Sequence, residues 1–193
     1  MAQTLPLLRH LILRLNDAGK RALADGFPLG VTASCSRLVE LEIYGGRLGA
    51  LPLELGSLTE LTRLKLLAAR VSSLPDSISR LTALKDLDLS GNRDVTLSPS
   101  VGLLAGLTQL RLVKGGALSL PDSVSRLTAL QHLYLSGNET VSLNPFLGAL
   151  AALTSLQLVN AGIASLPDSI SRLTKLQELK CAATCARLLS LRA

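Results

Sequence analysis

The 193-residue sequence predicts an α/β solenoid, with a parallel β-sheet on its concave face and short helical or 3-10 turns and loops on its convex face. Leucine supplies 49 of the 193 residues, which is far above its ordinary share. These leucines recur in register every 23 residues, at Leu38, Leu61, Leu84, Leu107, Leu130, Leu153 and Leu176. Units of this length stack into solenoids, because none of them can bury its own apolar face alone.

The first half of each unit predicts a strand. Its pattern, L-x-x-L-x-L-x-x-N, is complete at Leu84, Leu87, Leu89 and Asn92. Residues two apart point to the same side of a strand, so the two leucines of the L-x-L stretch face the core and their neighbours face outward. Successive strands are expected to pair in parallel, about 4.8 Å apart, and to form the concave face.

The second half, L-P-x-x-I-x-x-L, predicts a return segment on the convex side, as in residues 74–81. The proline stops the chain from continuing as a strand, and either Asp76 or Ser77 is expected to cap one short helical turn. Asp76 and Arg80 are four residues apart and would pair weakly on the surface of such a turn.

These half-patterns resemble the leucine-rich-repeat family, over residues 38 to about 181. The L-P-x-x-I-x-x-L segment is similar to that of plant and animal intracellular leucine-rich-repeat proteins related to Ras-binding scaffolds, and to the arrays of plant immune receptors. The resemblance implies a horseshoe that binds a protein ligand on its concave side. It also implies that the asparagine bonds to the turn after the strand. Only Asn92 and Asn138 occupy that position, so the other turns are expected to use water or backbone partners.

A longer period of 46 residues is superimposed on the shorter one. Repeats that start at 61, 107 and 153 contain S-L-P-D-S-I/V-S-R-L-T, whereas those that start at 84 and 130 contain L-S-G-N. We interpret this as the duplication of a two-repeat unit, which gives two alternating convex surfaces without a change of fold.

Three segments follow from these patterns: an N-terminal irregular repeat or cap over 1–37, six repeats over 38–175, and a partial seventh repeat with a C-terminal cap over 176–193. Residues 5–15 are open to a second interpretation, an amphipathic capping helix. An organelle targeting peptide is a third, because basic residues precede the first acid, Asp17. No polar cap is evident after the last repeat, which leaves open a fragment or a covering partner.

Composition limits the function classes. Intrinsic disorder is excluded by the 48% hydrophobic content, and no uninterrupted apolar run is long enough for a membrane span. Three cysteines and no secretory signal predict an intracellular, cytoplasmic protein. The net charge of +6 suggests nucleic acid or an anionic membrane, but residues 38–173 hold 11 basic and 11 acidic residues, so the excess lies at the ends. We therefore expect no nucleic-acid partner.

Catalytic and metal-binding constellations are not expected. The histidines are His10 and His132, and neither lies beside a predicted nucleophile. Cys181 and Cys185 are four residues apart without further ligands nearby. We predict no enzymatic activity, no cofactor and no metal.

The outward strand positions form the predicted binding surface. Over the first four repeats their rows alternate acidic and basic, so neighbouring rows face opposite charges. This pattern suits both a self-neutralising sheet and a docking surface. Arg111 and Tyr134 are the predicted centre, because arginine and tyrosine anchor many interfaces. The predicted protein-binding residues are Glu42, Arg63, Lys65, Asp88, Arg111, His132, Tyr134 and Gln157.

The function predicted from the sequence is a non-catalytic protein-interaction module, monomeric by default, with a protein partner of unknown identity. Two alternatives stay open. One is an architectural subunit packed in a larger assembly, and the other is a fragment of a larger intracellular immune-type receptor.

Overall fold

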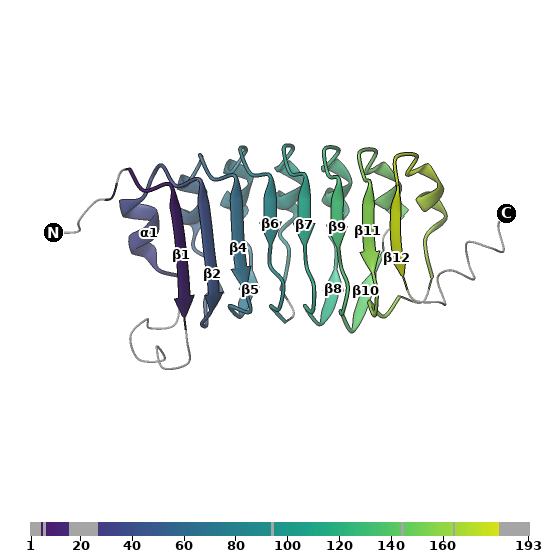
Figure 1. Cartoon of the computed structure of the whole chain (residues 1–193), viewed down its shortest axis with the longest axis horizontal. Coiled ribbons are helices and arrows are strands. Elements are labelled where there is room, and N and C mark those ends of the chain that lie inside the picture. The colour runs from purple at the N-terminus through teal and green to yellow at the C-terminus, as the bar shows by residue number, and fades with distance from the viewer. Residues whose placement is uncertain are drawn as a thin grey trace.

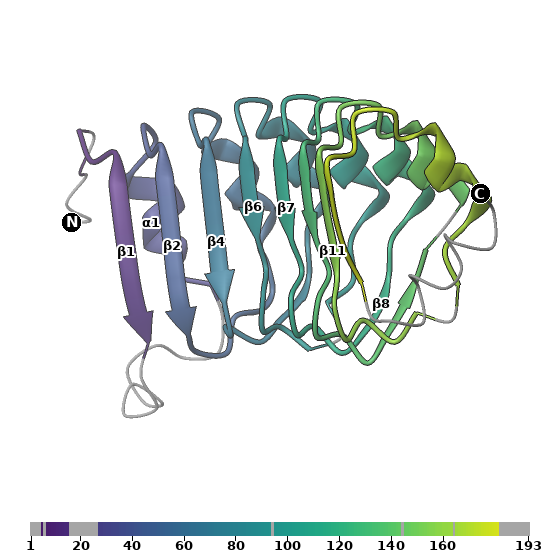
Figure 2. The same ribbon diagram turned by 45° about the vertical axis from the view of Figure 1, so that its right-hand side comes forward.

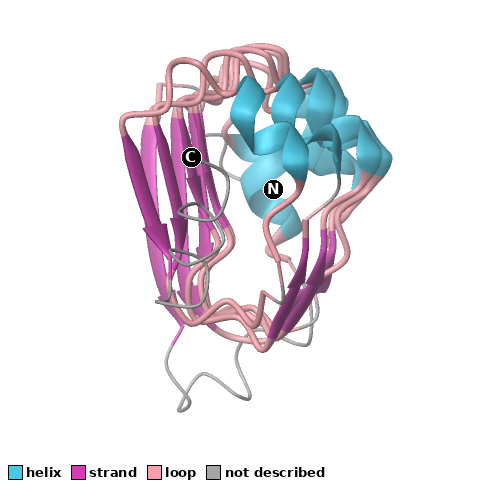
Figure 3. Cartoon of the chain, turned by 90° about the vertical axis from the view of Figure 1, so that its right-hand side faces the viewer, coloured by secondary structure: helices cyan, strands magenta, loops and turns pink. Residues whose placement is uncertain are grey.

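The structure, a computed structural model, describes residues 5, 7–15, 27–93, 95–143, 145–163 and 165–181. In this part of the chain a parallel sheet lines one face of a solenoid, and short 3-10 turns cover the opposite face (Figure 1 and Figure 3). The strands follow one another along the array in sequence order, and the array curves toward its C-terminal end (Figure 2). The predicted α/β solenoid is confirmed.

Eight strands of the described residues form the concave sheet. They are β1 (His10–Leu15), β2 (Glu40–Gly45), β4 (Arg63–Leu67), β6 (Asp86–Asp88), β7 (Gln109–Arg111), β9 (His132–Tyr134), β11 (Ser155–Leu158) and β12 (Glu178–Cys181). All neighbouring pairs are parallel, and from β2 onward paired residues are 23 apart, as Leu64 and Leu87 are. The period of the sequence is therefore the register of the sheet.

The N-terminal repeat has a longer step. β1 pairs with β2 at an offset of 30 residues, since His10 lies opposite Glu40. Because residues 10–15 form a strand, the capping helix over residues 5–15 is wrong. Part of the additional length forms α1 (Leu29–Ser34), a six-residue helix in the return position beside the first 3-10 turn, and the sequence patterns did not predict it. Residues 16–26 of the expected insertion lie outside the described residues.

Leucines from the strands and the return segments form one continuous core. Leu87 and Leu110 are completely buried, and Ile78 closes the core from the convex side. Each fully buried leucine contributes about 1.5–3 kcal/mol through the removal of apolar surface from water. In the repeats where a leucine of the pattern is replaced, Val95 and Val141 are buried one position later and fill its place.

Six 3-10 turns of the described residues form most of the convex face. They are η2 (Leu53–Ser57), η3 (Asp76–Arg80), η4 (Pro99–Leu103), η5 (Asp122–Arg126), η6 (Pro145–Ala149) and η7 (Asp168–Arg172). Beside them are two short two-stranded sheets, β3 (Gly49–Ala50) with β5 (Val71–Ser73) and β8 (Ala117–Ser119) with β10 (Thr140–Ser142).

The expectation that Asp76 or Ser77 caps its turn is wrong. Pro75 is the N-terminal cap of η3, and no side chain bonds to that end of the turn. The Asp76 carboxylate instead accepts hydrogen bonds from the hydroxyls of Ser98 and Ser100 in the next repeat, and these bonds lower its pKa. The Asp76 carboxylate therefore bonds between repeats rather than within its own turn.

Asparagine side chains join alternate pairs of repeats. Asn92 is fully buried; its Nδ2 donates to the carbonyls of Leu66 and Leu89, and its Oδ1 accepts from the amides of Ala69 and Val71. One asparagine thus satisfies its own turn and the turn of the preceding repeat, where alanine stands at the asparagine position. Water or backbone partners, which we expected for that turn, are not needed there.

Asn138 also bonds both to its own turn and to the turn of the preceding repeat. Asn138 donates to the carbonyls of Leu112 and Leu135 and accepts from the amide of Gly115. The two asparagines therefore join the repeats that start at 61 and 84, and those that start at 107 and 130.

Glycines join the other pairs of repeats on the convex face. A β-carbon at Gly56 would lie 2.5 Å from the carbonyl oxygen of Ser77, and Gly102 and Gly148 face Ser123 and Ser169 in the same way. No larger residue fits such a close approach between two backbones. These contacts connect η2 with η3, η4 with η5, and η6 with η7. Glycine contacts and asparagine hydrogen bonds therefore alternate between successive repeats along the array.

Candidate functional site

The outward side chains of the sheet line the concave face in rows one strand apart. From β2 to β12 the two central positions are Glu40 and Glu42, Arg63 and Lys65, Asp86 and Asp88, Gln109 and Arg111, His132 and Tyr134, Ser155 and Gln157, and Glu178 and Lys180. The register thus brings all eight predicted site residues onto this one surface. Whether they bind a partner stays a prediction.

Ion pairs neutralise the first column of this surface. The guanidinium of Arg63 lies 2.7 Å from Glu40 on one side and 3.4 Å from Asp86 on the other. Asp86 is also 3.0 Å from the guanidinium of Arg111, and Glu40 is 2.9 Å from Nδ1 of His10. The chain of contacts crosses five strands, from β1 to β7.

An ion pair also neutralises the first two rows of the second column, Glu42 and Lys65. Lys65 lies 2.8 Å from Glu42, which also accepts a hydrogen bond from the Tyr44 hydroxyl. These contacts lower the pKa of Glu42, and the same hydrogen bond raises the pKa of Tyr44. Asp88 is only 7% exposed and accepts a hydrogen bond from the amide of Ser90, so its carboxylate stabilises the end of β6.

A partly apolar area begins where the charged rows end. The Arg111 guanidinium lies over the ring of Tyr134, 5.1 Å from its centroid, and the His132 ring is stacked at 6.2 Å from Tyr134. Nδ1 of His132 is buried and has no hydrogen-bond partner among the described residues. We call Arg111, His132 and Tyr134 the aromatic cluster. Gln157 is half-buried in the next row.

A third outward column borders the aromatic cluster. Leu67 and Val113 are half-buried and Val159 is 40% exposed. The alternate positions are serines, whose hydroxyls accept hydrogen bonds from the amides of Val113 and Val159. Apolar side chains therefore recur every second strand on this side of the sheet, as the 46-residue period implies. The contact of Arg14 with the ring of Tyr44, 5.3 Å from its centroid, was not predicted.

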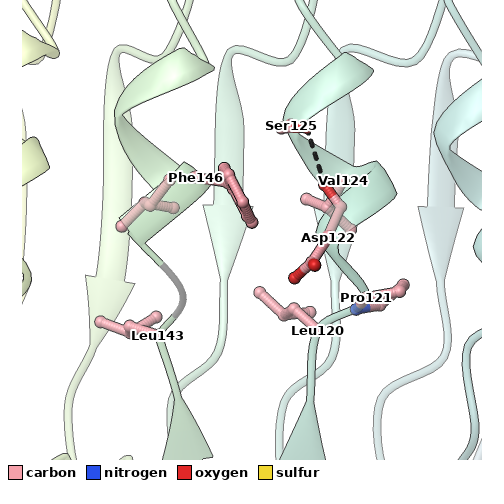
Figure 4. Close-up of a pocket in the computed structure, with 8 residues that line it drawn as sticks. Leu120, Pro121, Asp122, Val124, Ser125, Leu143 and Phe146 are labelled. Carbon is pink, nitrogen blue, oxygen red and sulfur yellow. Dashed lines mark hydrogen bonds between the residues drawn. The ribbon is translucent and has the colours of Figure 1, made fainter.

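A pocket on the convex face lies between η5 and η6 (Figure 4). Its apolar lining includes Leu120, Leu143 and Phe146, with the Asp122 carboxylate at its side. Its empty volume of about 270 Å³ includes open solvent, and is below the range of about 300–1,000 Å³ that is usual for small-molecule sites. The described residues contain no group of three or more histidines, cysteines or acids that could hold a metal ion.

Solved structures that are similar to the chain share one architecture. A leucine-rich-repeat protein of Leptospira interrogans matches 92% of the chain, with 24% identity and a TM-score of 0.66. The Arabidopsis receptor kinase HAESA, solved with the peptide hormone IDA and the co-receptor SERK1, matches 91% of the chain, with 28% identity and a TM-score of 0.64. The leucine-rich-repeat domain of the type III effector XopL matches 91%, with 20% identity and a TM-score of 0.67.

The chain has the leucine-rich-repeat fold. No family model matches its sequence, and no curated protein does. This leucine-rich-repeat chain covers 51% of the Leptospira protein and 30% of the HAESA chain. The similarity does not distinguish the subclasses that the sequence resembles.

Location is not decided by these comparisons. Several similar structures are receptor ectodomains, so the predicted cytoplasmic location stays a prediction. Among the described residues of the chain, no helix is long and apolar enough to cross a membrane.

Proposed function

We propose that this leucine-rich-repeat array is a non-catalytic module that binds a protein partner on its concave face, with the aromatic cluster at the centre. The observation that carries the proposal is the contact of Arg111 with Tyr134 beside His132, next to the apolar column. Arginine and tyrosine are the residues that most often dominate binding energy at interfaces.

The charged rows are a weaker candidate for the centre. Arg63 and Lys65 are already paired with acids of neighbouring strands, so a partner would have to compete with these contacts. Exchanging one partly exposed ion pair for another changes the free energy little. In contrast, covering the rings of His132 and Tyr134 removes apolar surface from water. We therefore assign orientation of the partner to the charged rows and most of the affinity to the aromatic cluster.

The test is a pull-down with the double variant Arg111→Ala/Tyr134→Ala. Asp86 keeps its contact with Arg63 in this variant, so the charged rows should remain intact. The matched control is Arg126→Ala/Phe146→Ala, which removes an exposed arginine and an exposed aromatic ring from the convex face.

The cluster variant should recover at least tenfold less partner than the wild type, because each interface anchor contributes about 2 kcal/mol or more. The control should recover the same amount as the wild type. Equal recovery by the two variants would contradict the proposed site. The architectural-subunit and immune-receptor alternatives remain predictions, and size-exclusion chromatography at low concentration bears on the first of them.

A further inference from the structure

Basic side chains gather on one edge of the solenoid, in the turns that follow the concave strands. Arg47, Arg70 and Arg93 occupy the same position of three successive repeats, 23 residues apart, after β2, β4 and β6. Lys114 follows β7 in the fourth repeat. All four side chains belong to exposed residues. In Figure 1 this edge is the one toward which the arrowheads of the concave strands point. We call these four residues the basic edge.

Hydrogen bonds stack these turns directly on one another. The amide of Leu48 donates to the carbonyl of Ala69 at 2.8 Å, and the amide of Gly49 donates to the carbonyl of Arg70 at 3.2 Å. Further along, the amide of Gly91 donates to the carbonyl of Val113 at 2.7 Å. Four such turns, each about 4.8 Å from the next, span about 14 Å. The basic edge is therefore one continuous row.

These cations are not neutralised within the described part of the chain. Among the described residues, no carboxylate lies within 4.0 Å of Arg47, Arg70, Arg93 or Lys114, whereas Arg63, Lys65 and Arg111 on the concave face each contact an acid. Asp94 follows Arg93 in the sequence and lies outside the described residues. The repeats are neutral in sum, but the fold separates their charges.

Two of the four residues occupy backbone conformations that favour glycine. Arg70 has a φ of 52° and Lys114 has a φ of 56°. Glycine stands at the equivalent position two repeats after Arg70, at Gly116, and one repeat after Lys114, at Gly137. A long basic side chain is thus held where the backbone alone would favour glycine, and such strained residues are frequent at functional sites.

We propose that the basic edge is a second interaction surface, which binds a short acidic segment of a protein partner in extended conformation. The proposal goes beyond the concave-face function and does not depend on it. About five extended residues, at about 3.3 Å each, match the length of the row. Glu139 takes the arginine position in the fifth repeat and would repel an anion, so it limits the segment to the first four turns.

An acidic peptide fits this edge better than nucleic acid does. Proteins that bind single strands combine cations with exposed aromatic rings on which bases stack. Tyr44, the aromatic residue at the end of β2, is covered by the guanidinium of Arg14 and bonded to Glu42. The basic edge therefore offers charge without a stacking surface.

The experiment measures fluorescence anisotropy of a labelled hexaglutamate peptide with the full chain. The edge variant is Arg47→Gln/Arg70→Gln/Arg93→Gln. The matched control is Arg80→Gln/Arg126→Gln/Arg172→Gln, which removes the same charge from exposed positions on the convex turns. Affinity for the peptide should fall about tenfold in the edge variant, which corresponds to about 1.4 kcal/mol, because the variant loses three weak ion pairs with the peptide. The control should change it less than twofold.

Further measurements separate the alternatives. Binding by the wild type should disappear near 1 M salt, where the screening length is about 3 Å. An equal loss in both triple variants would overturn the proposal, because net charge alone would then explain binding. Absence of binding by the wild type, or tighter edge-dependent binding of an oligothymidine of the same charge, would also overturn it. The Arg111→Ala/Tyr134→Ala variant should bind the peptide as the wild type does, so this proposal and the concave-face function fail independently.

Discussion

The buried side-chain amide of Asn92 makes four hydrogen bonds with the backbone. Asn92 needs two donors for the carbonyls above and below it and an acceptor for two amides. Only asparagine offers both in a side chain of this length. Aspartate would place a charge against two carbonyl oxygens, and leucine would leave all four backbone groups without partners.

Replacing Asn92 with alanine should lower the free energy of unfolding by about 3 kcal/mol, because each buried polar group left unsatisfied costs about 1–3 kcal/mol. Urea denaturation followed by circular dichroism measures this change. Asn160→Gly is the control: Asn160 is exposed and has a φ of 52°, which glycine adopts readily, so a change below about 0.5 kcal/mol is expected there. Similar losses in the two variants would contradict the bridging role of Asn92.

At this scale the sequence predicted types of residue better than their partners. A hydrogen bond from Asn92 to the turn after its own strand was expected. Its hydrogen bonds to the turn of the preceding repeat were not, because they depend on how closely two repeats stack. The acid–base alternation of Glu40, Arg63 and Asp86 was predicted correctly, because strand register follows directly from the period. That no carboxylate of the described residues lies within 4.0 Å of the basic-edge arginines became evident only when the turns were placed together.

Among the elements, the convex turns show how one residue type sets a packing distance. Gly102 allows the backbone of η4 to approach that of η5 at Ser123, whereas the corresponding positions of η3 and η5 are Ser79 and Ser125. Glycine is required only at alternate turns. The pocket between η5 and η6 lies at a junction without this glycine contact.

Gly102→Ala should destabilise the protein by about 1–3 kcal/mol, as overpacking in a close-packed region does, since the new methyl group meets the carbonyl of Ser123. Gly30→Ala is a matched control inside α1, where a β-carbon would meet nothing within 4 Å. There the substitution should be neutral or stabilising by up to about 1 kcal/mol. Thermal unfolding of both variants distinguishes them, and a stable Gly102→Ala protein would show that the turns can separate at no cost.

Element boundaries were less predictable than element order. The strands followed from alternating leucines. The return segments were expected to be short helical or 3-10 turns, and they are 3-10 turns; the cap expected at Asp76 or Ser77 was wrong, because Pro75 occupies the N-terminal cap of η3. Few residues fit between L-P and the next buried leucine, and the tighter 3-10 turn suits that length. α1 was missed because residues 29–34 carry neither a capping residue nor a full apolar period.

Across the whole molecule, stability should decrease from the middle of the array toward its ends. Among the described residues, each strand of the concave sheet pairs only with its neighbours, so a central strand is supported from two sides, whereas β1 and β12 are each paired on one side. The core positions of β12, Leu179 and Cys181, are half-buried, whereas Leu110 of β7 is fully buried.

Hydrogen exchange measured by mass spectrometry should therefore be slowest in β6, β7 and β9 and faster in β1 and β12. Local opening at the ends exposes less apolar surface and costs less free energy than opening in the middle. Uniform protection over all eight strands would show instead that the array unfolds as a single cooperative unit.

The alternation of asparagine and glycine junctions has a consequence for how such an array can change length. Counting from Leu38, the five junctions use glycine, asparagine, glycine, asparagine and glycine in turn. Removing one 23-residue repeat brings together two repeats that were not neighbours before. The new junction then lacks the matching glycine contact or asparagine bond. Removing or adding 46 residues restores the same sequence of junctions. The unit that can be added or removed without a change of junctions is consequently a pair of repeats. Length variants of this chain should therefore differ by even numbers of repeats.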